Sequence, residues 1–386
     1  MSDEFISPIK KFWNTTENNS ATPVNKDVLD SFVKASLEFP GNSNSLHTLG
    51  VRCNKLIESA TKQIADIFKI KETEIIYTSG SSESNNLAIK GVCMKYKNRG
   101  KHIITTHYEH SSIYGPLSYL QSEGFEVDFV DSDEFGLVDL KHLESLIRED
   151  TILVSINAIN SEIGILQPIE EIGKIVKKNP KCFYHVDLTQ AVSKVDINLE
   201  NVDLASFSAH KFFGIKGIGG LIKKEKIVIE PLIHGGKSTT IFRSGTPATP
   251  LIASFAKALR LVYEDFEKKD KYVRELNNYF IDKLSNLDVS INSNKHCIPQ
   301  IVNLSIKGIK PETMQHALEE YEIYISTQTA CSTGDYSRTV YAVTHNKEKA
   351  SHSIRVSLSY KTTYEEIDDF IDAFSRLIID LNIRGE

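Results

Sequence analysis

The segment Ser206-Phe-Ser-Ala-His-Lys-Phe-Phe-Gly-Ile-Lys-Gly-Ile-Gly-Gly220 joins two short apolar runs, residues 204–208 and 220–223, through a glycine-rich turn. Runs of this length, bounded by turn residues, predict strands. Lys211 lies three residues after the end of the first run, among serine, histidine and phenylalanine residues. Most lysines are solvated surface charges, so residue type alone predicts little here. The surroundings of Lys211 make it a candidate for a desolvated amine that can form a Schiff base.

Five further β-rich runs precede this segment, and amphipathic stretches separate the runs. The seven predicted strands cover residues 74–78, 102–106, 126–130, 151–156, 182–186, 204–208 and 220–223. Apolar residues recur at intervals of three and four in the predicted helices 84–96, 140–148 and 169–178. This alternation predicts an α/β fold in which a seven-stranded, mostly parallel sheet lies between helices. Several strands are apolar on both faces, as a covered sheet requires.

The pattern changes after Thr249. A long charged helix is predicted over residues 250–284, followed by strands near 301–305 and 354–358 and a last helix over 364–381. We therefore predict three parts: an N-terminal arm (1–20), a large domain (21–249) and a smaller C-terminal α+β domain (250–386).

Composition limits the function classes. The chain has 386 residues, 40% of them hydrophobic and 25% charged, as in soluble globular proteins. A net charge of −6 gives no basic field for nucleic acid. No secretory signal and no run of about 20 apolar residues is present, so we expect a cytoplasmic chain without a membrane partner. The five cysteines are scattered and form no CxxC pair, which argues against a disulfide framework or a metal site.

Two other segments carry polar groups at predicted strand ends. Thr78-Ser-Gly-Ser-Ser-Glu-Ser-Asn-Asn86 lies between a strand and a helix, where backbone N–H groups and the helix dipole favour a phosphate; an ordinary serine-rich helix cap is the alternative. Asp187 follows an apolar strand, where it is suited to hold a protonated pyridine nitrogen or to cap a turn. Together with Lys211, these groups are what a pyridoxal 5'-phosphate (PLP) enzyme needs: an amine, an acid at the ring nitrogen and a phosphate site.

At this point the sequence resembles the cysteine desulfurases of the class V aminotransferase family, which have the type I PLP-enzyme fold. The likeness extends from about residue 21 to residue 367. It rests on Tyr77-Thr-Ser-Gly-x-x-Glu-Ser84, Tyr108-Glu-His110, Glu162-Ile-Gly164, His185-Val-Asp-x-Thr-Gln190, Ser208-x-His-Lys211, His234-Gly-Gly236, Arg243-Ser-Gly-Thr246, Ala330-Cys331 and Ser353-Ile-Arg355.

The resemblance implies roles around the cofactor ring. Lys211 would bind the cofactor, and Asp187 would contact its ring nitrogen. Gln190 would contact the phenolic oxygen, while His110 would stack on the ring and help to move protons.

The resemblance also implies a phosphate site and a partner subunit. Ser81, Ser82, Ser208 and His210 would bind the phosphate. Thr246 resembles the residue that the family contributes to the neighbouring subunit's phosphate site, which implies a homodimer.

Four residues are implied at the substrate. Asn42, Ser161 and Arg355 would frame it, with Arg355 on the substrate carboxylate, and Cys331 would be the nucleophile. L-cysteine would then give L-alanine and a persulfide on Cys331. A sulfur-acceptor protein, such as an iron–sulfur scaffold, or a thio-cofactor or tRNA pathway, would take the sulfur.

Some positions depart from the family pattern. Ser161 replaces an asparagine, and Lys237-Ser238-Thr239 replaces a segment resembling Gly-Gln-Glu. Two alternatives therefore stay open: a class V aminotransferase or lyase that acts on another amino acid, and a low-activity scaffold that binds a partner.

Overall fold

The computed structural model describes residues 21–327 and 336–385. Their contacts separate two compact units. The larger unit comprises Ala21–Ser161 and Ile165–Phe266. The smaller unit contains Glu162–Gly164 and the chain from Glu267 onward.

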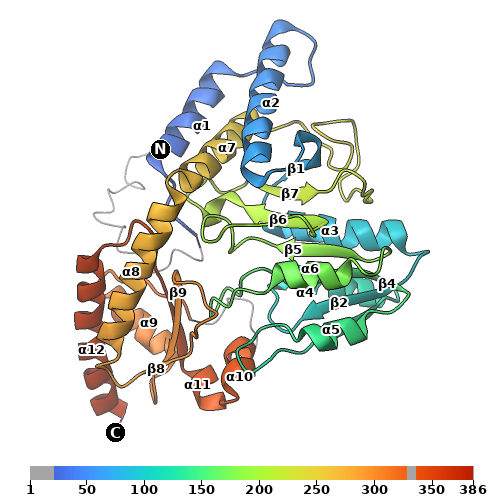
Figure 1. The fold of residues 1–386 in the computed structure, drawn as a ribbon. Helices are drawn as coiled ribbons and strands as arrows, with labels where there is room; N and C mark the ends of the chain where they lie inside the picture. Colours follow the sequence, from blue (N-terminus) through green and yellow to red (C-terminus); the bar gives the residue numbers. More distant parts are fainter. Residues whose placement is uncertain (1–20, 328–335, 386) are drawn as a thin grey trace. The chain divides into compact units, whose positions relative to one another are not determined.

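The larger unit is built on a seven-stranded sheet (Figure 1). Its strands are β1 (Ile75–Thr78), β2 (His102–Thr106), β3 (Glu126–Val130), β4 (Thr151–Asn157), β5 (Phe183–Asp187), β6 (Leu204–Ser208) and β7 (Gly219–Lys223). They lie in the order β1-β7-β6-β5-β4-β2-β3; β7 runs antiparallel to both of its neighbours, β1 and β6, and the other neighbouring pairs are parallel. The predicted seven-stranded, mostly parallel sheet is confirmed, and each strand begins and ends within one residue of its predicted bounds.

Helices cover both faces of this sheet. The larger unit contains α1 (Lys26–Glu38), α2 (Thr48–Phe68), α3 (Ser81–Tyr96), α4 (Ser111–Ser122), α5 (Leu140–Leu146), α6 (Ile169–Val176) and α7 (Thr249–Tyr263), with short 3-10 turns η2 (Glu72–Glu74) and η3 (Ala209–Lys211). The chain crosses the sheet in one direction up to β3 and then reverses. Because parallel crossovers are right-handed, α3 and α4 cover one face and α5 and α6 the other.

One predicted helix is two helices in the structure. The stretch 250–284 divides into α7 and α8 (Phe266–Leu284), with Asp265 at a φ of 52° between them. A left-handed residue ends regular α-helix, and the charge pattern of the sequence gave no sign of it. The contacts divide the chain after Phe266 because α7 packs on α1 and α2, whereas the sequence placed the domain boundary after Thr249.

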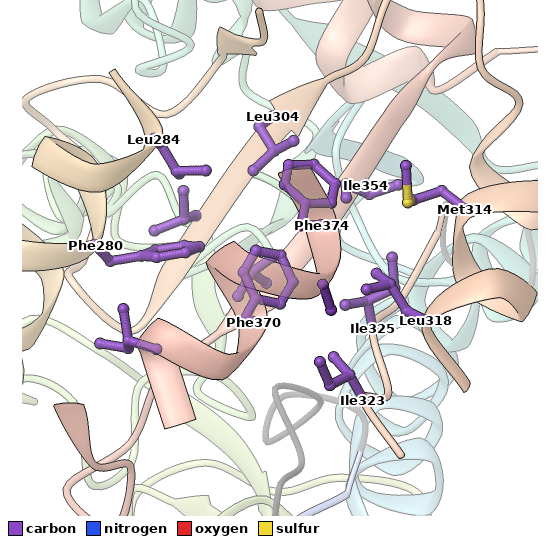
Figure 2. Packing of buried hydrophobic residues seen from close by; sticks show 14 of the residues in the cluster. Phe280, Leu284, Leu304, Met314, Leu318, Ile323, Ile325, Ile354, Phe370 and Phe374 are labelled. Atoms are coloured by element: carbon purple, nitrogen blue, oxygen red, sulfur yellow. The ribbon is translucent and has the colours of Figure 1, made fainter. Parts of the chain in front are cut away.

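The smaller unit packs helices on a three-stranded antiparallel sheet of order β10-β9-β8. Its elements are α8, β8 (Ser290–Ile291), β9 (Ile301–Ser305), α9 (Pro311–Glu319), α10 (Arg338–Thr344), α11 (Lys347–Ser351), β10 (Ser353–Ser357) and α12 (Tyr364–Gly385). Figure 2 shows its core, where Phe280, Phe370 and Phe374 are buried together. The ring centroids of Phe280 and Phe370 lie 5.4 Å apart in an edge-to-face contact.

Within the described ranges, none of the helices combines the length and the apolar character needed to cross a membrane.

Gly219 lets the chain after β1 approach β7. It pairs with Thr78 on one side and with Ser208 on the other. A Cβ at Gly219 would lie 2.6 Å from the Cα of Gly80 and 2.7 Å from the Phe207 carbonyl oxygen. Both are backbone atoms that cannot move aside cheaply, so the contact between β7 and the β1–α3 turn requires glycine.

We expect Gly219→Ala to lower the free energy of unfolding by about 2 kcal/mol, because overpacking at backbone atoms is not relieved by rotamer changes. Urea denaturation measures the change. Gly236→Ala is the matched control, since a Cβ there meets nothing within 4 Å. Equal stability of the two variants would show that the approach of Gly80 does not constrain the fold.

Glu109 ties the loop after β2 to β4 through a buried carboxyl group. Its Oε1 accepts a hydrogen bond from the Thr106 hydroxyl (2.7 Å) and another from the Asn157 N–H (3.0 Å). Burial, with a smaller contribution from the Asp187 charge, raises the pKa of Glu109 to about 8. The folded state therefore holds a proton that the unfolded chain releases near pH 4.5.

This difference makes stability fall as the pH rises from 4.5 towards 8, because the unfolded state loses its proton first. Glu109→Gln keeps the Oε1 acceptor and removes the titration. We expect the free energy of unfolding of the variant, relative to wild type, to grow across this pH window in urea titrations. A difference that does not depend on pH would contradict the buried, protonated carboxyl.

Candidate active site

The carboxyl ends of the parallel strands bring the predicted cofactor residues to one edge of the sheet. His110 follows β2, Asp187 ends β5, and Lys211 follows β6. The neighbouring strands β2 and β4 lead to helices on opposite faces, which is the switch point where open α/β sheets bind ligands. These three predicted residues therefore converge at the edge where chemistry is expected.

Asp187 is a buried carboxylate with a fixed orientation. Its Oδ2 accepts a hydrogen bond from Asn85 Nδ2 of α3 at 2.8 Å. Its Oδ1 accepts another from the Thr189 N–H, also at 2.8 Å. Only 6% of the residue is exposed. Two N–H donors hold a negative charge at the end of β5, where a cationic ring nitrogen would be stabilised.

His110 is the N-cap residue of α4. Its Nδ1 accepts a hydrogen bond from the Ser112 N–H at 3.1 Å and lies 2.8 Å from the Ser112 hydroxyl. Loss of hydration lowers the pKa of His110 below 6.5, the Asp187 carboxylate raises it, and Lys211 lowers it again. The ring is therefore neutral at physiological pH.

Lys211 lies in η3, half-buried, next to two histidines. Its positive charge contributes to lowering the pKa of both His110 and His210. Burial is the larger cause at His210, whose pKa falls to about 4. Lys211 therefore lies within electrostatic reach of two imidazoles that can take part in proton transfer.

The predicted phosphate residues gather beside the N-terminus of α3. This helix begins after Gly80, which has no side chain to cap the free N–H groups of the first turn, where Ser81 and Ser82 lie. A Cβ at Gly80 would lie 3.4 Å from Ser208 Oγ. Ser208 Oγ in turn lies 2.9 Å from His210 Nδ1. Hydroxyl, imidazole and backbone donors thus surround one small space.

Gln190 is buried, and a lysine fixes its amide. Lys194 Nζ donates to Gln190 Oε1 at 2.5 Å, and both residues are at most 7% exposed. Because an ammonium group only donates, the oxygen of the amide faces Lys194 and its NH₂ group faces away. The amide therefore presents a donor to any oxygen on its other side.

These residues fit PLP. Thr189 Oγ1 is buried beside Asp187 without a hydrogen-bond partner. Burying a hydroxyl without a hydrogen-bond partner is costly. Such a group is expected where a bound ligand completes the site. The acid, the amine and the serine-lined turn at Gly80 lie at the carboxyl ends of β5, β6 and β1, and a pyridine ring with a phosphate arm needs these three groups at one edge of the sheet.

The other predicted residues lie elsewhere. Asn42 is exposed between α1 and α2, and its Oδ1 accepts a hydrogen bond from the Asn44 N–H at 3.0 Å. Thr246 is exposed and lines a small pocket with Ser79. Ser161 is half-buried at the end of the segment that follows β4.

Two predicted residues fall outside the larger unit or outside the described ranges. Arg355 belongs to β10 of the smaller unit, where it is 4% exposed and donates from Nη2 to Ser326 Oγ at 2.8 Å. Cys331 lies outside the described residues.

Sequence analysis missed three residues that hold this site: Asn85, Ser112 and Lys194. Two of them lie three or four residues from a predicted site residue, Lys194 in a series of turns and Asn85 on a helix. Lys194 is four residues after Gln190, and Asn85 is one turn after the predicted phosphate serines of α3. Ser112 gave no comparable signal, because its partner Asn85 comes from another helix.

Comparison with known proteins gives consistent results. The family model described as aminotransferase class-V matches residues 16–370. The mitochondrial cysteine desulfurase of Saccharomyces cerevisiae is 38% identical over 365 residues, covering 92% of this chain and 73% of the relative. The cysteine desulfurase IscS of Dictyoglomus turgidum is 36% identical and covers 93% of each chain.

Solved structures agree with the sequence comparisons. A NifS-like protein superposes with a TM-score of 0.90 at 35% identity, covering 95% of this chain and 99% of that one. A structure of SspA in complex with cysteine gives a TM-score of 0.80 at 29% identity, covering 90% and 99%. The chain belongs to the class-V aminotransferase family and, within it, to the PLP-dependent cysteine desulfurases.

Proposed function

We propose that the chain converts L-cysteine to L-alanine at the carboxyl edge of the seven-stranded sheet and leaves the sulfur as a persulfide on Cys331. The observation that carries this proposal is the convergence of Asp187, His110 and Lys211 at the sheet's switch point. When bound, PLP supplies an electron sink that makes the α-proton of the substrate acidic and allows its C–S bond to break.

Side chains and backbone groups of the chain bind the ring nitrogen, the phenolic oxygen and the phosphate of the cofactor. Asp187, held by two N–H donors, balances a protonated ring nitrogen. The amide of Gln190, turned by Lys194, donates to the phenolic oxygen. The first turn of α3, with Ser81 and Ser82, binds the phosphate together with Ser208 and His210.

Lys211 moves the substrate protons. Its amine takes the α-proton of L-cysteine and returns a proton to the carbon chain as alanine forms, and neutral His110 assists at the sulfur. The Cys331 thiolate attacks the substrate sulfur as the C–S bond breaks, and the electron pair of that bond stays with carbon, which takes up a proton. The products, L-alanine and a Cys331 persulfide, contain all atoms of the reactants, so no oxidant is needed.

Arg355 is the proposed partner of the substrate carboxylate. Asn42 and Ser161 are proposed to contact the substrate as well. The Arg355 guanidinium is buried, Ser326 Oγ holds its Nη2, and its planar form can bind a carboxylate through two N–H groups, which supports this role. Ser161 provides a hydroxyl where the family has an amide, which weakens one contact to the substrate.

A second copy of the chain is the first proposed partner. Large apolar side chains are exposed on α1, in the loop before α2 and at the start of α2: Leu29, Val33, Leu37, Leu46, Leu49 and Val51. Ile241 is 68% exposed in the segment that leads to Thr246. Apolar surface of this extent marks an interface, and it supports a homodimer in which Thr246 reaches the partner's phosphate site.

The remaining proposals concern sulfur delivery. The outer sulfur of a persulfide is transferred to an acceptor thiol. A sulfur-acceptor protein, such as an iron–sulfur scaffold, is therefore the second proposed partner. We place the reaction in the cytoplasm, which keeps thiols reduced.

We expect wild-type protein loaded with PLP to release alanine from L-cysteine in the presence of a thiol reductant. Lys211→Ala and Cys331→Ser should each lose at least about a thousandfold in rate, because the proton carrier or the nucleophile is gone. Lys95→Ala and Cys297→Ser are the matched controls and should keep wild-type rates. Bound PLP without alanine release from wild type would favour another amino acid as substrate.

We expect the wild-type chain to have the mass of two copies in light scattering, and Leu37→Glu combined with Leu46→Glu to have the mass of one, because charges at an apolar interface are not compensated. Tyr321→Glu, an exposed change in the smaller unit, is the control. A monomeric wild-type protein would contradict the shared site at Thr246.

A further inference from the structure

A chain of hydrogen bonds connects Asp187, the residue proposed at the ring nitrogen of the cofactor, to His110, the residue proposed to stack on the ring. Asn85 Nδ2 lies 2.8 Å from Asp187 Oδ2 and 2.9 Å from Ser112 Oγ. Ser112 Oγ lies 2.8 Å from His110 Nδ1. Asn85 is completely buried in α3, and α3 packs on α4, which carries Ser112.

The chemistry of the groups fixes the direction of every bond in this chain. A carboxylate only accepts, so the amide NH₂ of Asn85 faces Asp187 and its second N–H reaches Ser112 Oγ. The Ser112 hydroxyl accepts that bond, which leaves its own proton for His110 Nδ1. The Ser112 N–H also donates to Nδ1, so this nitrogen carries no proton and the neutral ring is protonated at Nε2.

We propose that Asn85 and Ser112 are positioning residues of the desulfurase reaction, which hold His110 in the Nε2–H form and connect its ring to the Asp187 carboxylate. The catalytic part of this inference rests on the proposed function. The tautomer part rests only on the bonds above. The Nε2–H group is then available to donate a hydrogen bond to the substrate sulfur. The imidazole acts there as a neutral donor rather than as a cation.

An ordinary helix cap explains only part of this arrangement. His110 caps α4 through the Ser112 N–H alone, and that bond needs neither the Ser112 hydroxyl nor Asn85. The fully buried Asn85 donates in two directions, while its Oδ1 is buried without a partner. Burying that oxygen without a partner costs free energy. The two hydrogen bonds that Nδ2 donates offset this cost.

The charged groups that act on the ring come from two elements. Asp187 of β5 favours the protonated ring, and Lys211 of η3 opposes it. Like Lys211, the Ser112 hydroxyl disfavours protonation of the ring, because a donor at Nδ1 stabilises only the unprotonated nitrogen. Removing that hydroxyl should therefore raise the pKa of His110, in the direction that Asp187 already favours.

The test uses histidine labelled with ¹⁵N in the cofactor-free full chain, so it does not depend on activity. Two-bond ¹H–¹⁵N correlations report which nitrogen is protonated, and loss of one signal in His110→Gln assigns it. We expect the Nε2–H form in wild type. Ser112→Ala and Asn85→Leu keep the backbone N–H donor, so each should increase the share of the Nδ1–H tautomer without making it the main form, and Ser112→Ala should raise the His110 pKa by about half a unit.

Ser112→Thr, which keeps the hydroxyl, should restore the wild-type tautomer and pKa. Ser122→Ala, at the exposed other end of α4, should change neither. A proton on Nδ1 in wild type, or a tautomer and pKa unchanged in Ser112→Ala, would overturn the inference.

The loaded enzyme gives the second readout. The acid limb of the kcat/KM profile should move to higher pH in Ser112→Ala by the shift seen in the ¹⁵N titration, with PLP absorbance retained. An acid limb that stays in place while the ¹⁵N titration shifts would overturn the catalytic role. Wild type that shows the tautomer but releases no alanine would refute the proposed function and leave the bonding intact.

Discussion

The site depends on one interaction: the Asp187 carboxylate, buried at the end of β5 and held by Asn85 and the Thr189 N–H. A negative charge in this position is tolerable only because two N–H donors stabilise it. The same amide that steadies Asp187 also reaches Ser112 and, through it, His110. One buried charge thus organises groups from α3, α4 and β5 before any cofactor binds.

The fold supplies the frame for this charge. Parallel strands deliver their carboxyl ends to one edge, and the reversal of chain direction after β3 opens the switch point between β2 and β4. Small residues then allow close approach. Gly219 brings β7 against the β1–α3 turn, and Gly80 in that turn lies beside Ser208. The close packing of this turn and the position of the buried charge are therefore consequences of one topology.

The departures from the family pattern leave the residues proposed at the cofactor ring unchanged. Ser161 and the Lys237-Ser238-Thr239 segment differ from the family, whereas Asp187, Gln190 and Lys211 match it. The comparisons show a cysteine desulfurase, so these changes act within that chemistry. Since a hydroxyl replaces an amide at Ser161, differences from relatives are expected in how the substrate is held.

The sequence by itself determined the seven strands, the class of cofactor and the motif around Lys211, because strand periodicity and the chemistry of a PLP site are local properties of short segments. Only the tertiary structure decided the break at Asp265, the turn of the Gln190 amide towards Lys194, and the bonds that join Asn85 to Asp187 and Ser112. These depend on directions in space between helices and strands far apart in the chain, and residue spacing does not encode such directions.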